Sequence, residues 1–399
     1  MKSSLMIAFL LVLTACVPSG GQEKLSPDVP WSTRIAESFL QRYPKAIPYN
    51  AGSPQLRWNY EQGLIQEALR RVGEVTGEKK YYEYVKSNID IYVMEDGSIK
   101  TYDYDNFNID NIPPGRQLLR LYQITGDAKY KKAADLLRKQ LSNQPRTPSK
   151  GFWHKQIYPN QMWLDGIYMG EPFYAEYGLL FNEPSNFDDV AHQIILIEKH
   201  TRDPKTGLLY HAWDESKEQR WANPKTGQSP HFWGRAIGWY AMGIVDVLDY
   251  LPHNHKNRAE IIDILRRLSN ALVKVQDRAT GLWYQVIDQG DREGNYLEAS
   301  ASSMFAYAFA KGAKKGYLDQ QFLGIARRAF DGIIKELVTV DENGLVSLHQ
   351  VCAVAGLGGN PYRDGSYEYY IGELKRTNDF KGVGPFILAA LELETVRPN

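Results

Sequence analysis

The chain has 399 residues, of which 43% are hydrophobic, and its 47 basic residues balance 47 acidic ones. This length fits one or two domains, and the apolar content is sufficient for a large core. Because no basic stripe accompanies the balanced charge, nucleic acid is excluded as an expected partner.

The N-terminus carries a predicted export signal. Residues 1–15 contain an apolar run of about ten residues after Lys2, which is typical of a signal peptide and too short to span a membrane. The run ends in "LTAC", which resembles the lipobox of bacterial lipoproteins, so Cys16 is the predicted lipidation site. Residues 16–30 are rich in Gly, Pro and Ser and predict a flexible tether. The alternative is an ordinary cleaved signal with a chance cysteine.

Lipidation at Cys16 would make the protein a lipid-anchored protein of the bacterial cell envelope, either periplasmic or in the outer membrane. That anchor is the one membrane contact that we expect. Cys352 then has no partner for an intrachain disulfide. No Cys/His spacing resembles a zinc site, and "GLGG" lacks the Lys-Ser/Thr of a phosphate-binding loop. We therefore expect neither a metal ion nor a cofactor.

Helical periodicity dominates the rest of the chain. In "LRWNYEQGLIQEALRRVGEVTG" the residues Leu64, Ile65, Ala68 and Leu69 recur at the spacing of an amphipathic helix. The segment "VTGEKKY" is followed 49 residues later by "ITGDAKY", and both predict a helix–Gly–helix corner. Twelve such helices are predicted, centred near residues 38, 66, 86, 119, 135, 170, 193, 242, 266, 305, 328 and 388.

Twelve antiparallel helices can pair into six hairpins. The pattern therefore favours an all-α (α/α)6 barrel over an open solenoid, with residues 31–399 as a single catalytic domain. Polar and aromatic residues concentrate between the helices, which predicts a substrate cleft built by loops on one face. These segments are 102–116, 151–170, 207–239, 281–303 and 359–385.

The first acidic loop, "YDYDNFNIDNIPPGRQLL", holds three candidate carboxylates. We interpret Asp103 and Asp105 as solvated loop residues. Asp110 precedes two prolines that suit the entry to a helix, so it is either a helix-capping acid or a site residue.

Asp165 is the more unusual acid, because it lies among Trp163, Leu164, Ile167 and Met169. Burial in such surroundings disfavours the charged form of a carboxyl group, and a raised pKa suits a general acid near neutral pH. The alternative is a helix-terminal Asp that binds backbone N–H groups.

A dense set of His, Trp and Arg residues follows in "LLYHAWDES" and "SPHFWGRAIGWYAMG". Arg235 and Trp239 are four residues apart and share a helix face. Arg can grip a carboxylate through two hydrogen bonds, and Trp offers a flat face to a sugar ring. The alternative is stacking between Trp and Arg within the core. With Asp110 and Asp165, these residue types fit carbohydrate hydrolysis.

Three of these segments resemble one known family. "GFWHKQIYPNQMWLDGIYMG", "FWGRAIGWYAMG" and "YLEASASSMFAYAFAKG" are similar to motifs of the unsaturated rhamnogalacturonyl hydrolases, glycoside hydrolase family 105. The resemblance runs from about Trp58 to "KGVGPFILAALE" and is most specific at "QMWLDGIYM". The unsaturated glucuronyl hydrolases of family 88 are a related group with the same fold and mechanism.

The resemblance implies a role for each matched residue. Asp165 matches the catalytic acid/base, and Asp110 matches a second aspartate that holds sugar hydroxyls and helps to set the first. The implied substrate-binding residues are Tyr60, His154, Lys155, Trp163, His211, Trp233, Arg235 and Trp239. Arg235 or His211 is the expected partner of the substrate carboxylate.

The implied reaction removes a 4,5-unsaturated uronic acid from the non-reducing end of an oligosaccharide left by a polysaccharide lyase. The expected partner is thus an oligosaccharide, with unsaturated galacturonyl-rhamnose from rhamnogalacturonan as first choice, and no protein partner is implied. Three alternatives stay open from sequence. They are a glucuronyl hydrolase acting on glycosaminoglycan or ulvan fragments, a sugar epimerase or isomerase using His154 and His211, and a non-catalytic glycan-binding lipoprotein.

Overall fold

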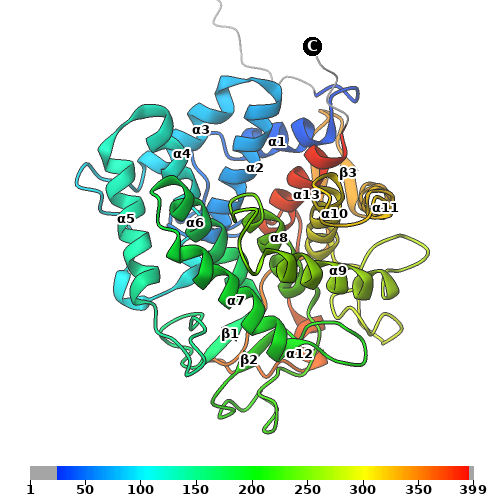
Figure 1. Cartoon of the computed structure of the whole chain (residues 1–399). Coiled ribbons are helices and arrows are strands. Elements are labelled where there is room, and N and C mark those ends of the chain that lie inside the picture. The colour runs from blue at the N-terminus through cyan, green and yellow to red at the C-terminus, as the bar shows by residue number, and fades with distance from the viewer. Residues whose placement is uncertain (1–24, 395–399) are drawn as a thin grey trace, which may run out of the picture.

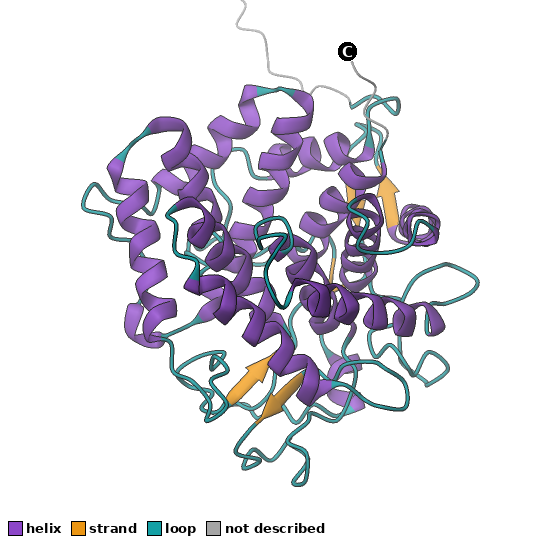
Figure 2. Ribbon diagram, in the orientation of Figure 1, coloured by secondary structure: helices purple, strands orange, loops and turns teal. Residues whose placement is uncertain are grey.

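Helices make up most of the computed structural model, which describes residues 25–394 (Figures 1 and 2). Each of the twelve helices that the periodicity predicts is present in this part of the chain. They are α1 (Trp31–Arg42), α2 (Tyr60–Thr76), α3 (Lys79–Asp90), α4 (Gly115–Thr125), α5 (Ala128–Asn143), α6 (Asp165–Leu180), α7 (Ser185–Thr201), α8 (Gly234–Val247), α9 (Arg258–Lys274), α10 (Ala299–Lys314), α11 (Gln321–Leu337) and α13 (Phe380–Leu393).

Short elements lie in the loops between these helices. They are the turns η1 (Tyr104–Asn106) and η2 (Ile109–Asn111), the helix α12 (Tyr367–Gly372), and the strands β1 (Gln161–Trp163), β2 (Ala212–Asp214), β3 (Val338–Val340), β4 (Val346–Leu348), β5 (Val351–Cys352) and β6 (Lys375–Arg376). The strands form three antiparallel pairs, β1–β2, β3–β4 and β5–β6.

The helices form an (α/α)6 barrel with two concentric rings. The inner ring runs α2, α4, α6, α8, α10 and α13, with each helix contacting the next and α13 contacting α2. The outer helices α3, α5, α7, α9 and α11 each contact the inner helix that precedes them. The sixth hairpin joins opposite ends of the chain, because α1 packs on α13 and the Ser32 N–H donates to Glu394 Oε1 over 3.0 Å.

The predicted N-terminal segments lie largely outside the described residues. The signal peptide, Cys16 and the tether up to residue 24 fall in that part. The last residues of the predicted tether are described, and the Leu25 N–H donates to the Asn343 carbonyl over 3.0 Å. Within residues 25–394, no helix is both long enough and apolar enough to cross a bilayer.

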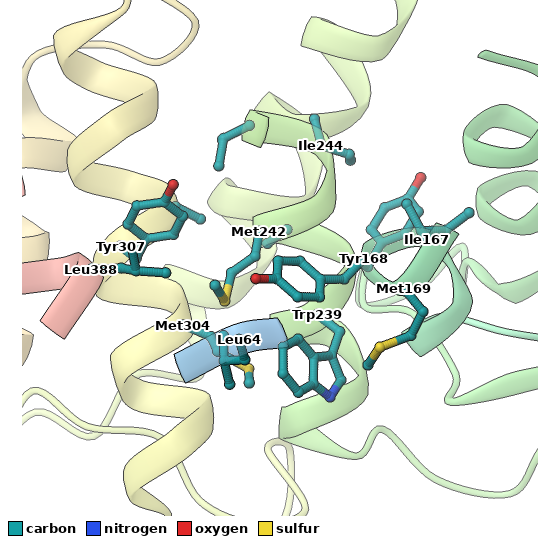
Figure 3. Close-up of a cluster of buried hydrophobic side chains, with 14 of the residues drawn as sticks. Leu64, Ile167, Tyr168, Met169, Trp239, Met242, Ile244, Met304, Tyr307 and Leu388 are labelled. Carbon is teal, nitrogen blue, oxygen red and sulfur yellow. The ribbon is translucent and has the colours of Figure 1, made fainter. Parts of the chain in front are cut away.

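The inner helix α8 is buried on all sides. Every residue of α8 is buried, whereas the outer helix α9 buries only one face. A helix that is apolar around its whole circumference belongs in a core. Figure 3 shows part of that core, where Leu64, Tyr168, Met242, Met304 and Leu388 from five inner helices converge.

Small residues let these inner helices approach closely. A side chain at Gly238 of α8 would place its Cβ 2.6 Å from the sulfur of Met304 on α10. The two predicted helix–Gly–helix corners are also present. Gly77 and Gly126 end α2 and α4 in the left-handed conformation, with φ of 74° and 70°, which glycine adopts without strain.

The barrel presents the first turns of its inner helices to one end. Tyr60 begins α2, Asp165 begins α6, and Arg235 and Lys381 lie in the first turns of α8 and α13. Figure 1 shows β1, β2 and α12 gathered at the lower end of the barrel. The loops that precede the inner helices therefore decide which side chains meet there.

Candidate active site

One pocket collects most of the predicted site residues. It holds about 460 Å³ of space free of protein atoms, including its open mouth. Asp110 and Asp165 both line it, although they are far apart in the sequence. The other lining residues are Tyr60, His154, Lys155, Tyr158, Trp163, Met169, Trp233, Arg235, Trp239, Val354, Ala355, Arg363 and Lys381.

Asp165 is the first residue of α6 and directly follows β1. The pairing of Trp163 with Ala212 and the hydrogen bond from the Leu164 N–H to the His211 carbonyl, 3.0 Å, fix this corner. Asp165 is only 9% exposed, and its carboxylate makes no helix-capping hydrogen bond among the described residues. The capping alternative is therefore wrong, and the carboxylate faces the pocket.

His211 supports Asp165 from behind. Its Nε2 lies 3.3 Å from Asp165 Oδ2, but the direction is too oblique for a good hydrogen bond, and neither atom has another partner within residues 25–394. Its Nδ1 lies 2.8 Å from the Tyr370 hydroxyl. Burial lowers the pKa of His211 despite the opposing charge of Asp165, so the imidazole is neutral near pH 7.

The prediction that His211 contacts substrate needs correction. Its side chain is fully buried and is not among the groups that line the pocket. His211 directly precedes β2 and lies behind the pocket wall, between Trp163 and Trp233. His211 is thus a positioning residue for Asp165.

Asp110 is an ion-paired carboxylate. Lys155 Nζ lies 2.6 Å from its Oδ2, and His154 Nε2 lies 3.2 Å from its Oδ1. Burial alone would raise the pKa of Asp110, but the charges of Lys155 and His154 hold it well below its ordinary range. Helix α4, which the two prolines precede, has Pro114 at its N-cap and no side-chain cap, so Asp110 is not its capping acid.

Aromatic rings form the walls around the two aspartates. Trp163 stacks between His154, at 4.7 Å between ring centroids, and Tyr158, at 4.9 Å. Across the pocket, Tyr60 meets Trp239 edge to face at 6.1 Å. Such flat, partly apolar walls suit the faces of a sugar ring.

Arg235 lines the pocket as expected, but its charge is already engaged. The side chain is 1% exposed, and its Nη2 lies 3.4 Å from Glu298 Oε1 and donates to the Cys352 carbonyl. Its Nε donates to Ser300 over 2.8 Å. This commitment argues against Arg235 as the group that receives a substrate carboxylate.

Six lining residues lay outside the residues predicted for the site. Four come from the segment 359–385 or the residues shortly before it, and two come from the segment 151–170. They are Tyr158, Met169, Val354, Ala355, Arg363 and Lys381. The aromatic cluster of segment 359–385 was the available signal for Arg363 and Lys381.

The described residues contain no group of three or more His, Cys, Asp or Glu side chains placed to hold a metal ion. The lining side chains offer acid–base chemistry: a buried acid that no lysine or arginine pairs among the described residues, one carboxylate with a fixed negative charge, and neighbouring donors. One acid of this kind can both deliver and receive a proton.

Comparison with known proteins matches this chain to glycoside hydrolases. The model of Glycosyl Hydrolase Family 88 matches residues 31–397. The structure of a family 105 glycoside hydrolase from C. acetobutylicum ATCC 824 is 47% identical, with a TM-score of 0.88 over 92% of this chain and 99% of that one.

Two curated relatives match parts of the chain. A 24.9 kDa protein in the picA locus of Rhizobium radiobacter is 41% identical over 230 residues, which is 56% of this chain and 97% of the relative. The unsaturated rhamnogalacturonyl hydrolase YesR of Bacillus subtilis (strain 168) is 29% identical over 263 residues, 64% of this chain and 71% of the relative.

Proposed function

Since this chain belongs to the glycosyl hydrolases of families 88 and 105, we propose that it releases a 4,5-unsaturated galacturonic acid from rhamnose at the non-reducing end of rhamnogalacturonan fragments. The observation that carries the reaction is the single unpaired acid, Asp165, in a pocket with an aromatic wall. The likeness to a curated unsaturated rhamnogalacturonyl hydrolase supports the choice of glycan.

The chemistry uses the double bond rather than the anomeric carbon. Asp165 gives its proton to C4, which leaves positive charge shared between C5 and the ring oxygen. Water adds to C5 and returns a proton to the Asp165 carboxylate. The resulting hemiketal opens to a ketone, and the hemiacetal formed at C1 collapses and releases the rhamnose hydroxyl. No enzyme nucleophile is needed, so one acid/base suffices.

Asp110 orients the ring for this step. Its carboxylate stays ionised beside Lys155 and His154, and it accepts hydrogen bonds from sugar hydroxyls. Trp163 and Trp239 restrict the ring to a narrow set of positions. Such positioning supplies a further part of the rate, because the reacting atoms are already aligned when substrate binds.

A panel of lyase-generated oligosaccharides from pectin, hyaluronan, heparin and ulvan tests the substrate. Turnover consumes the double bond, so the fall in its ultraviolet absorbance reports the rate. We expect the rhamnogalacturonan fragment to have the highest kcat/KM. A preference for glycosaminoglycan or ulvan fragments would instead support a glucuronyl hydrolase. Mass spectrometry separates hydrolysis from epimerisation, since only hydrolysis adds water and yields two products.

Replacing Lys155 by Met is expected to make activity more sensitive to acid. Without this cation the buried Asp110 carboxyl has a higher pKa and becomes protonated as the pH falls. Because each pKa unit changes the ionised fraction about tenfold below the pKa, kcat/KM should fall roughly tenfold more at about pH 5 than at about pH 8. The Lys155→Arg variant keeps the charge and should keep the wild-type profile. An unshifted acidic limb in Lys155→Met would argue against this role of Lys155.

We also propose that Cys16 carries a lipid that anchors the enzyme in the bacterial envelope, on the strength of the "LTAC" segment. In a bacterial host, the full-length chain should partition with the membrane fraction and incorporate radiolabelled palmitate. Cys16→Ser should do neither. Membrane retention of the Cys16→Ser variant would remove the anchor from this position.

A further inference from the structure

Arg363 is the pocket cation without a carboxylate partner. Four cationic side chains line the pocket, and three are paired. Lys155 binds Asp110, Arg235 lies against Glu298, and Lys381 Nζ lies 2.7 Å from Asp379 Oδ1. Among residues 25–394, no carboxylate lies within 4.0 Å of the Arg363 guanidinium. A fixed, half-buried positive charge therefore faces the pocket uncompensated.

The loop after β5 holds this guanidinium firmly. Arg363 Nε donates to the Gly358 carbonyl over 2.9 Å, and Nη2 donates to the Leu357 carbonyl over 3.1 Å and to the Tyr158 hydroxyl over 2.7 Å. A side chain at Gly356 would place its Cβ 2.3 Å from Nη1, so the backbone packs directly on the cation. Nη1 itself has no hydrogen-bond acceptor among the described residues and is left for a ligand.

Arg363 also lines the same pocket as the reacting group, Asp165. Its Cζ is 6.0 Å from the ring of Trp163, and Trp163 directly precedes the Leu164–Asp165 corner. In the proposed substrate the carboxylate is attached to C5, next to the C4 that Asp165 protonates. The group that binds the carboxylate must therefore line the same pocket as the acid, as Arg363 does.

We propose that Arg363 binds the carboxylate of the unsaturated uronic acid and so sets specificity for acidic over neutral or esterified sugars. This inference rests on the proposed function and names the specificity residue of that site. His211 is buried too deeply for this task, and Arg235 is engaged by Glu298. Arginine suits a carboxylate because its planar fork offers several N–H donors in one plane.

The test compares Arg363→Gln with wild type on two substrates, an unsaturated disaccharide with a free carboxylate and its methyl ester. Loss of a charge-assisted hydrogen bond should raise KM for the free acid roughly 10- to 100-fold. KM for the ester should change little, because the ester carries no charge for Arg363 to neutralise. Arg220→Gln is the matched control, since Arg220 is exposed, lies outside the pocket and stacks on Tyr362.

Equal losses on both substrates would show that Arg363 only supports the loop, and would overturn the inference while leaving the proposed function intact. If the Arg363→Gln variant does not fold, the inference is tested by comparing the two substrates with the wild-type enzyme alone. Methyl esterification must then raise its KM by a similar factor, and an unchanged KM would overturn the inference. If wild type hydrolyses neither substrate, both the inference and the proposed function are wrong.

Discussion

Replacing Asp165 by Asn should lower kcat on the unsaturated disaccharide by roughly 10²- to 10⁴-fold, the usual contribution of a general acid/base. Asparagine has nearly the same shape as aspartate but cannot deliver a proton to C4 or take one from water. The free carboxylate of Asp165 makes no capping hydrogen bond in the described structure. The fold should therefore survive, and KM should change much less than kcat. The measurement is the loss of double-bond absorbance under saturating substrate.

Asp105→Asn is the matched control for this prediction, because Asp105 is an exposed acid in the loop before Asp110. It should retain wild-type kcat and KM. Thermal unfolding of both variants separates lost chemistry from lost structure. Near-normal turnover by a folded Asp165→Asn protein would remove Asp165 from the mechanism and require another residue as the general acid.

The helices could be predicted because their signal is local. Apolar spacing within a single segment marked each of the twelve long helices, and a glycine at the end of α2 and α4 marked the corner. Closure of the barrel has no such local signal. It depends on α1 meeting α13, for example through Ser32 and Glu394, which are 362 residues apart.

The candidate site also combines features that the local sequence predicts with features that depend on distant residues. Residue types placed His211 and Arg235 near a cleft, but their roles depend on distant partners. Tyr370, 159 residues further along, holds His211 behind Asp165, and Glu298, 63 residues further along, neutralises Arg235. Arg363 was missed for the converse reason. Its proposed role rests on the lack of a carboxylate partner among residues 25–394, which becomes visible only after the other pocket cations have been paired.

The second substitution with a large expected effect is at Asp246, a residue that stabilises the barrel and does not line the pocket. This residue of α8 is 1% exposed and binds three side chains. Arg116 Nη1 of α4 lies 2.9 Å from Oδ2, while Lys311 Nζ of α10 and the Tyr307 hydroxyl each lie 2.7 Å from Oδ1. Three inner helices thus meet at one carboxylate. Asp246→Asn would leave two buried cations short of a counter-charge.

We expect Asp246→Asn to lower the free energy of unfolding by roughly 3–5 kcal/mol, the usual effect of breaking a buried ion pair. Urea denaturation measures this difference. Asp263→Asn is the control, because Asp263 pairs with Arg266 on the surface, where both side chains are more than half exposed. Such exposed pairs contribute only about 0–1 kcal/mol. Equal stability of the Asp246→Asn and Asp263→Asn variants would contradict the structural role of Asp246.

The pH dependence of this difference provides an independent check on Asp246. Burial alone would raise its pKa, but Lys311 and Arg116 lower it below the ordinary value of an aspartate. A carboxyl group with a lowered pKa in the folded state stabilises the protein above its unfolded pKa, and loses this contribution as the pH falls through the folded pKa. The stability gap between wild type and Asp246→Asn should therefore be widest near neutral pH and narrow in acid. A stability gap that widens in acid would mean that the ionised Asp246 carboxylate is not the group that stabilises Arg116 and Lys311.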